Sequence, residues 1–187
     1  MPILSSDKRI SRLAADAAFL GAALLLSYVE AVIPIGALPL PGFKLGLSNL
    51  AVTAAAFRYS VKDAAAVSLC RILLNFLLFG SPTSLIFSLT GGIFVLAALT
   101  VFTRSAAAPH FSFLGISVLC AMMHNAGQLC ASFVLLGSAV LSYLPALTAA
   151  SLLYGGLNGV ILNRLPDFIY RADAVAGARA DGGKERP

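Results

Sequence analysis

Long runs of apolar residues dominate the chain, and short polar stretches separate them. Six apolar segments follow one another, at residues 13–33, 45–57, 64–79, 83–103, 113–136 and 142–163. A helix that crosses the bilayer needs ~20 apolar residues, and the first, fourth, fifth and sixth segments have this length. The second and third are shorter, so either protein shields them or their ends extend into neighbouring loops. The pattern predicts an all-α, polytopic membrane protein with six transmembrane helices.

The composition supports a membrane protein and argues against nucleic-acid binding. Hydrophobic residues make up 59% of the 187 residues and charged residues 11%, whereas an ordinary soluble domain carries about 25% charged residues. The net charge of +5 does not form a basic stripe with interleaved aromatic residues, which a nucleic-acid surface would need. We therefore expect the lipid bilayer, and no nucleic acid, as a partner.

The positions of the basic residues predict the orientation. The chain has 13 Lys and Arg residues, and six spans place all of them except Lys44 and Arg71 on the same side as the termini. Cytoplasmic loops are the ones enriched in Lys and Arg. We therefore expect both termini to be cytoplasmic, with multi-pass insertion in the inner (cytoplasmic) membrane. The expected domains are a cytoplasmic segment 1–12, a membrane domain 13–163 and a cytoplasmic, disordered tail 164–187.

Arg71 lies in the middle of the third apolar segment. A charged side chain near the bilayer centre costs at least ~2.5–3.5 kcal/mol on insertion scales, so Arg71 must face a partner, a polar cavity or a bound anion. Most other polar residues within the segments fall in the outer half, which predicts a pocket open to the outside. The candidate substrate-binding residues are Lys44, Asn49, Arg71, Asn75, His124, Asn125 and Gln128.

Simpler interpretations of these polar residues stay open. Arg71 and Glu30 could form a structural ion pair, since buried pairs are often neutral for stability. The histidine and amides of the fifth segment could make hydrogen bonds between helices. No metal site is predicted, because no Cys or His spacing matches one; Cys70, Cys120 and Cys130 are expected to be small buried side chains.

The first external loop, residues 34–44 (PIGALPLPGFK), combines three prolines with several apolar side chains. Water is a poor solvent for those side chains, and proline suits an irregular backbone with fewer N–H groups to satisfy. We expect this loop to fold as a lid over the pocket, although an apolar loop at the lipid interface would show the same composition.

Small residues recur at four-residue spacing in the first and sixth segments. Such stripes let helices approach closely. Ser151, Gly155 and Gly159 in the sixth segment are expected to serve packing within the protein. Ala14, Ala18 and Ala22 in the first segment either do the same or form a docking face for another membrane protein.

Motifs of common enzymes are missing from the sequence. There is no G-x-x-x-x-G-K-[ST] loop for ATP and no aspartate-rich cluster that would hold Mg²⁺ on a diphosphate. The few carboxylates are scattered and lie mostly at or beyond the cytoplasmic ends of the segments. We therefore expect a protein that is not an enzyme and that holds no cofactor of its own.

Four motifs together resemble one known family. They are GFKLGLSN at 42–49, SLCRILL at 68–74, SLTGG at 88–92 and HNAGQ at 124–128. Over residues 10–163 the chain resembles the Gx transporter family, whose members are often labelled heptaprenyl diphosphate synthase component I. This family is similar to the substrate-binding (S) components of energy-coupling-factor vitamin importers.

The resemblance implies a function and partners. S components are six-helix proteins that capture a vitamin beneath the first external loop. They dock through small residues of the first helix on a shared transmembrane coupling subunit, which cytoplasmic ATPases drive. The resemblance also implies a flavin, such as riboflavin, as the transported ligand. The alternative function is an accessory membrane subunit of polyprenyl (heptaprenyl) diphosphate synthesis.

Overall fold

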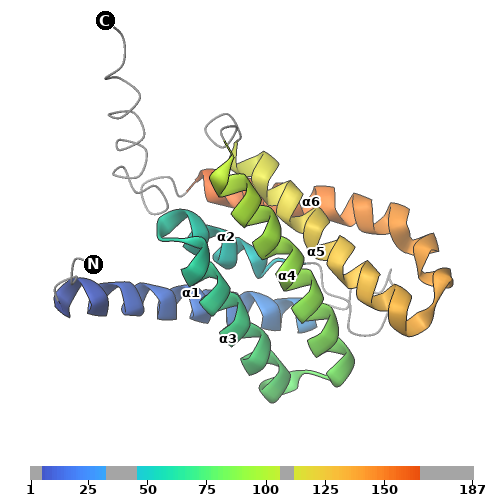
Figure 1. The fold of residues 1–187 in the computed structure, drawn as a ribbon, viewed down its shortest axis with the longest axis horizontal. Coiled ribbons are helices and arrows are strands. Elements are labelled where there is room, and N and C mark those ends of the chain that lie inside the picture. The colour runs from blue at the N-terminus through green and yellow to red at the C-terminus, as the bar shows by residue number, and fades with distance from the viewer. Residues whose placement is uncertain (1–5, 33–45, 106–111, 165–187) are drawn as a thin grey trace, which may run out of the picture.

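The computed structural model describes residues 6–32, 46–105 and 112–164, which form six α-helices (Figure 1). In chain order these are α1 (Ser6–Val32), α2 (Asn49–Arg58), α3 (Val61–Phe79), α4 (Pro82–Arg104), α5 (Phe113–Leu136) and α6 (Leu144–Asn163), with a short 3₁₀ helix, η2 (Ser138–Tyr143), before α6. The described ranges contain no strand. Each predicted apolar segment corresponds to one α-helix, so the all-α prediction is confirmed.

Four helical stretches are long and apolar enough to cross a membrane. They are Arg12–Val32, Pro82–Arg104, Phe113–Leu136 and Ser138–Asn163. Helix α3 has 19 residues but includes Lys62, Asp63 and Arg71. Helix α2 has only 10 residues, or ~15 Å at 1.5 Å per residue, about half of the ~30 Å hydrocarbon core. The helices support a membrane protein, whereas six complete spans and cytoplasmic termini stay predictions.

Serine side chains set where α3, α4 and α5 begin. The hydroxyl of Ser60 accepts a hydrogen bond from the Asp63 N–H, that of Ser81 from the Ser84 N–H and that of Ser112 from the Gly115 N–H. Each serine thereby satisfies one of the N–H groups that a helix start leaves without an intrahelical partner.

Helix α2 lies inside the molecule and contacts each of the other five helices. Asn49 and all residues from Ala51 to Ala56 are buried. The many alanines make α2 thin, so that five helices fit around it. Of the two explanations for the shortness of the second apolar segment, shielding by protein is therefore the correct one.

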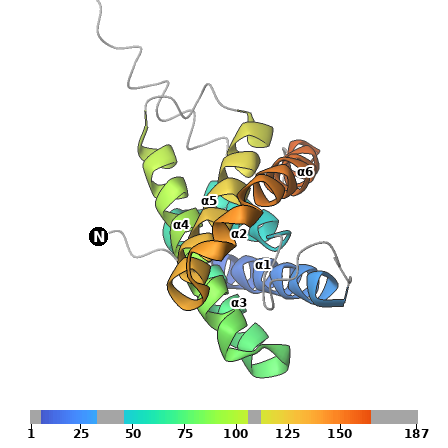
Figure 2. The ribbon, with the colours of Figure 1, turned by 90° about the vertical axis from the view of Figure 1, so that its right-hand side faces the viewer.

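Helix α1 lies at one edge of the molecule, and α5 and α6 run side by side on the opposite side (Figures 1 and 2). Within the described ranges α1 contacts only α2 and α3, and it does so through its buried residues Phe19, Ala23 and Ser27. Near its start, Arg12 forms an ion pair with Asp63 of α3.

Gly155 and Gly159 of α6 confirm the predicted packing role of its small residues. A Cβ atom on Gly155 would lie 2.7 Å from the Val118 Cα of α5, and one on Gly159 would lie 2.4 Å from the Leu114 Cα. Real Cβ atoms do not come this close to another backbone, so only glycine lets α5 and α6 approach to this distance.

Candidate functional site

The start of α2 is a meeting point for polar side chains from four other helices. The Leu47 N–H donates a 2.7 Å hydrogen bond to Glu30 Oε1 of α1. Arg71 of α3 donates through Nη1 to the Ser48 hydroxyl. Asn158 of α6 donates through Nδ2 to the Gly46 carbonyl, at 3.4 Å. Because α2 is short and central, its first residues lie among these helices rather than at the surface.

His124 of α5 fits between two glycines at this meeting point. A Cβ atom on Gly46 would lie 3.2 Å from His124 Cδ2, and one on Gly91 of α4 would lie 2.6 Å from His124 Nδ1. Gly46 also has φ +85°, a conformation that favours glycine. The His124 Nε2 atom lies 2.9 Å from the Gln128 amide nitrogen, so Gln128 holds the ring in place. We call the set Glu30, Ser48, Asn49, Arg71, His124 and Gln128 the polar junction.

Arg71 is the buried cation of the polar junction, with 2% of its surface exposed. Glu30, which carries the opposite charge, binds Leu47, the residue next to the Ser48 that Arg71 binds. Among the described residues, the Nε and Nη2 atoms of Arg71 have no hydrogen-bond partner. Leaving a buried donor unsatisfied costs ~1–3 kcal/mol, and more for a charged group. Arg71 therefore offers donors that the described part of the chain does not use.

Buried amides of the polar junction and of α3 also have unused hydrogen-bonding atoms. Within the described ranges these are Asn49 Nδ2, Asn75 Oδ1 and Gln128 Oε1. Asn75 is buried one turn after Arg71 on the same helix. The unused set thus includes both donors and acceptors, which a polar ligand with both kinds of group would match.

The structure brings together four of the seven predicted binding residues: Asn49, Arg71, His124 and Gln128. Asn75 shares the buried face of Arg71, and Lys44 lies outside the described residues, as does the predicted lid 34–44. Ser48 and Asn158 were not among the predicted residues. Ser48 directly precedes Asn49 within the GFKLGLSN motif, and Asn158 is an isolated amide in an apolar segment, so the sequence carried a weak signal for both.

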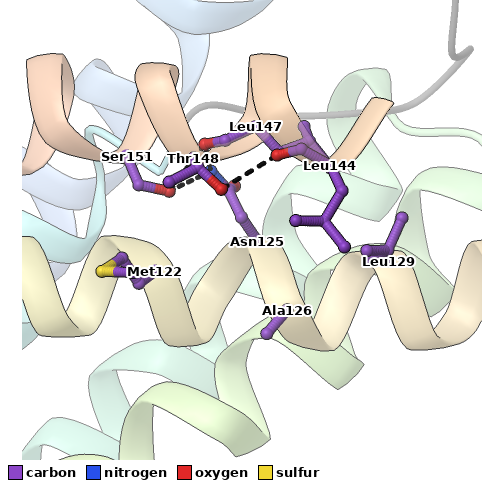
Figure 3. Close-up of a pocket in the computed structure, with 8 residues that line it drawn as sticks. All are labelled: Met122, Asn125, Ala126, Leu129, Leu144, Leu147, Thr148 and Ser151. Carbon is purple, nitrogen blue, oxygen red and sulfur yellow. Dashed lines mark hydrogen bonds between the residues drawn. The ribbon is translucent and has the colours of Figure 1, made fainter. Parts of the chain in front are cut away.

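Asn125 takes part in a different contact, between α5 and α6. Its Nδ2 atom donates to the Leu147 carbonyl at 3.2 Å and to the Ser151 hydroxyl at 2.7 Å. Figure 3 shows the side chain crossing from α5 to these two residues of α6. For Asn125 the simpler interpretation, a hydrogen bond between helices, therefore describes the observed contact.

Asn125 also borders a pocket between α5 and α6 (Figure 3). The pocket has a volume of about 210 Å³, and most of its lining is apolar. The lining residues are Met122, Asn125, Ala126, Leu129, Leu144, Leu147, Thr148 and Ser151. None of the six residues of the polar junction lines it, so it is a second and separate feature of the fold.

Ala14, Ala18 and Ala22 lie on the exposed face of α1. A Cβ atom on the neighbouring Gly21 would meet nothing within 4 Å. In the part of the chain that the structure describes, this stripe is thus not used for packing and is available to a partner or to lipid.

The cysteines correct one expectation and give no sign of a metal site. Cys120 is buried as expected, but Cys70 and Cys130 are exposed on the apolar surface. The expectation that all three are buried was wrong, because a small apolar residue on a helix of a membrane protein can face lipid as well as the protein interior. No group of three or more His, Cys, Asp or Glu residues that could hold a metal ion occurs among the described residues.

Comparison with known proteins gives one match. The family model described as "Heptaprenyl diphosphate synthase component I" matches residues 19–165, which covers most of the chain and every helix except the start of α1. Searches of curated proteins and of solved structures gave no match.

Proposed function

The chain belongs to the heptaprenyl diphosphate synthase component I family, and from this premise we propose that it is the substrate-binding membrane subunit of a cofactor importer. In this role it captures a flavin from the extracytoplasmic side and catalyses no reaction itself. One observation carries the proposal: Arg71 is buried, and two of its nitrogen atoms have no partner among the described residues. A buried charged residue in a membrane protein marks a functional site by default, and a bound ligand would complete the hydrogen bonds of Arg71.

The position of the polar junction supports this role. It joins the end of α1 to the start of α2. The predicted lid, residues 34–44, therefore lies in the chain between Val32 and Gly46, the described residues close to Glu30 and Ser48. A ligand held at this point would be linked to the loop that closes over it. The choice of flavin rests on the resemblance of the sequence motifs to the importer family.

The exposed alanine stripe of α1 supports a partner for the importer. Ala14, Ala18 and Ala22 would dock on a transmembrane coupling subunit, which cytoplasmic ATPases would drive. Small residues let two helices come close and gain van der Waals contact within the membrane.

Titration of purified protein with riboflavin, followed by quenching of flavin fluorescence, tests the proposal. We expect Arg71→Met to weaken binding by ~1–3 kcal/mol, which is about 5- to 150-fold, because methionine keeps the length and removes the charge-assisted hydrogen bonds. Arg104→Met, at the exposed end of α4, is the matched control and should bind like the wild type. Absence of quenching at micromolar wild-type protein would refute the flavin assignment, and equal binding by both variants would show that Arg71 belongs to the scaffold.

A second candidate function is an accessory role in polyprenyl diphosphate synthesis, and the α5–α6 pocket favours it. Its apolar lining suits part of an isoprenoid chain. If the pocket holds such a chain, Ala126→Phe should fill it and reduce the activity of the partner prenyl synthase reconstituted with this protein. Leu152→Phe, on an exposed part of α6, should have no effect. Equal activity with and without this protein would exclude the second function.

A further inference from the structure

Among the described residues, the charges of the polar junction balance. Glu30 and Arg71 are both more than nine-tenths buried and carry opposite charges, and they bind the adjacent residues Leu47 and Ser48, so the two charges lie close together. Glu30 also places a negative charge just before the start of α2, where the Leu47 N–H donates to its carboxylate, and this charge lies near the positive end of the helix dipole, which would otherwise attract an anion.

An anionic group of a ligand would therefore gain little at this point. It would meet a cation whose charge Glu30 already compensates, and it would lie near the Glu30 carboxylate, which repels it. Bringing a further charge into a buried site without an added counter-charge is strongly unfavourable.

The unused hydrogen-bonding atoms also favour an uncharged ligand group over an anionic one. Arg71 Nε, Arg71 Nη2 and Asn49 Nδ2 are donors, whereas Asn75 Oδ1 and Gln128 Oε1 are acceptors without partners among the described residues. A fully ionised phosphate offers only acceptor atoms and would leave both amide oxygens unsatisfied. A cyclic imide edge, C(=O)–NH–C(=O), offers two acceptors around one donor, so it can pair with Arg71 and with an amide oxygen at once.

We infer that the polar junction receives an uncharged imide edge of the ligand, and that no phosphate or other anionic group meets Arg71. This inference rests on the proposed flavin function and deepens it. The pyrimidine-dione end of the flavin ring enters the junction, and the ribityl chain with its terminal hydroxyl or phosphate points away from it.

The test uses four ligands on the full-length protein in detergent, followed by flavin fluorescence. They are riboflavin, riboflavin 5′-phosphate, lumichrome, which has the imide edge but no ribityl chain, and N3-methylriboflavin, in which the imide N–H is blocked. We expect N3-methylriboflavin to bind the wild type at least about tenfold more weakly than riboflavin, because a buried acceptor loses its partner. Arg71→Met should weaken the other three ligands by similar factors.

The variant Glu30→Gln tests whether a charged or an uncharged group of the ligand meets Arg71. It keeps an acceptor for the Leu47 N–H and leaves the Arg71 charge uncompensated. With the imide edge at the junction, the ratio of riboflavin to riboflavin-phosphate affinity should stay within about threefold of the wild-type ratio. If the phosphate met Arg71 instead, Glu30→Gln should raise the affinity for riboflavin 5′-phosphate relative to that for riboflavin by about tenfold or more.

The outcomes distinguish a failure of the proposed function from a failure of the imide assignment. Failure of every flavin to bind the wild type refutes the proposed function. Flavin binding in which Arg71→Met affects only the phosphate ester, or in which N3-methylation has no effect, overturns the imide assignment and leaves the function intact. If Arg71→Met or Glu30→Gln does not fold, the comparison of riboflavin with N3-methylriboflavin on the wild type decides alone.

Discussion

Two glycines of α6, three residues apart, differ in what surrounds them. A Cβ atom on Gly159 would lie 2.4 Å from the Leu114 Cα, whereas one on Gly156 would meet nothing within 4 Å. We expect Gly159→Ala to lower the free energy of unfolding by ~1–3 kcal/mol, because the α5 backbone must move. Gly156→Ala should be neutral or stabilising by up to ~1 kcal/mol, since alanine favours a helix interior.

Thermal unfolding of the two alanine variants in detergent checks this difference. Equal unfolding temperatures for Gly156→Ala and Gly159→Ala would mean that the α5–α6 contact is looser than the structure shows. The pair is informative because both substitutions make the same chemical change in the same helix.

Among the six α-helices, α1 has the fewest helix neighbours in the described part of the chain. In the described part of the chain it contacts α2 and α3 alone. Polar contacts hold it near both ends: Arg12 binds Asp63 and Ser60 near its start, and Glu30 accepts from the Leu47 N–H near its end. Between these two points its outer face, with the alanine stripe, is exposed. This arrangement suits a helix that packs on one side within the protein and on the other side against a partner.

Ala18→Leu and Ala23→Leu test the two faces of α1 separately. Ala18 is exposed, and Ala23 has no exposed surface. We expect Ala18→Leu to reduce co-purification with the transmembrane coupling subunit and to leave the unfolding temperature and riboflavin binding unchanged. Ala23→Leu should lower the unfolding temperature, because a well-packed interface does not accept the added volume. Normal co-purification of Ala18→Leu would argue against the docking role.

For the whole molecule, the short helix α2 raises the question of whether the chain crosses the membrane between residues 46 and 60. If it does, the α2–α3 turn is cytoplasmic and the α3–α4 turn is external, as the distribution of basic residues predicts. A membrane-impermeant thiol reagent on intact cells distinguishes the two sides. With Cys70, Cys120 and Cys130 replaced by alanine, Ser81→Cys should be labelled from outside, and Lys62→Cys only after the cells are opened. Labelling of both positions, or the reverse pattern, would contradict the predicted topology.

The sequence alone determined the positions and type of the helices. Apolar segments separated by Ser, Gly, Pro and charged residues were enough, because membrane insertion depends on local hydrophobicity and local helix boundaries. The sequence also identified Arg71 as a residue whose burial in a membrane costs free energy, and it indicated that Gly155 and Gly159 of α6 serve internal packing. Both conclusions follow from local physical chemistry: the cost of burying a charge and the space that a missing Cβ leaves.

Only the tertiary structure decided which polar residues meet. From the sequence, Asn125 and Gln128 belonged to one candidate pocket, but they point to different neighbours: Asn125 to α6, and Gln128 to His124. Likewise, the burial of α2 brings Ser48 to Arg71 across 23 positions and Gly46 to Asn158 across 112. Such contacts depend on the packing of helices far apart in the chain, and neither hydrophobic periodicity nor residue spacing encodes which faces turn toward one another.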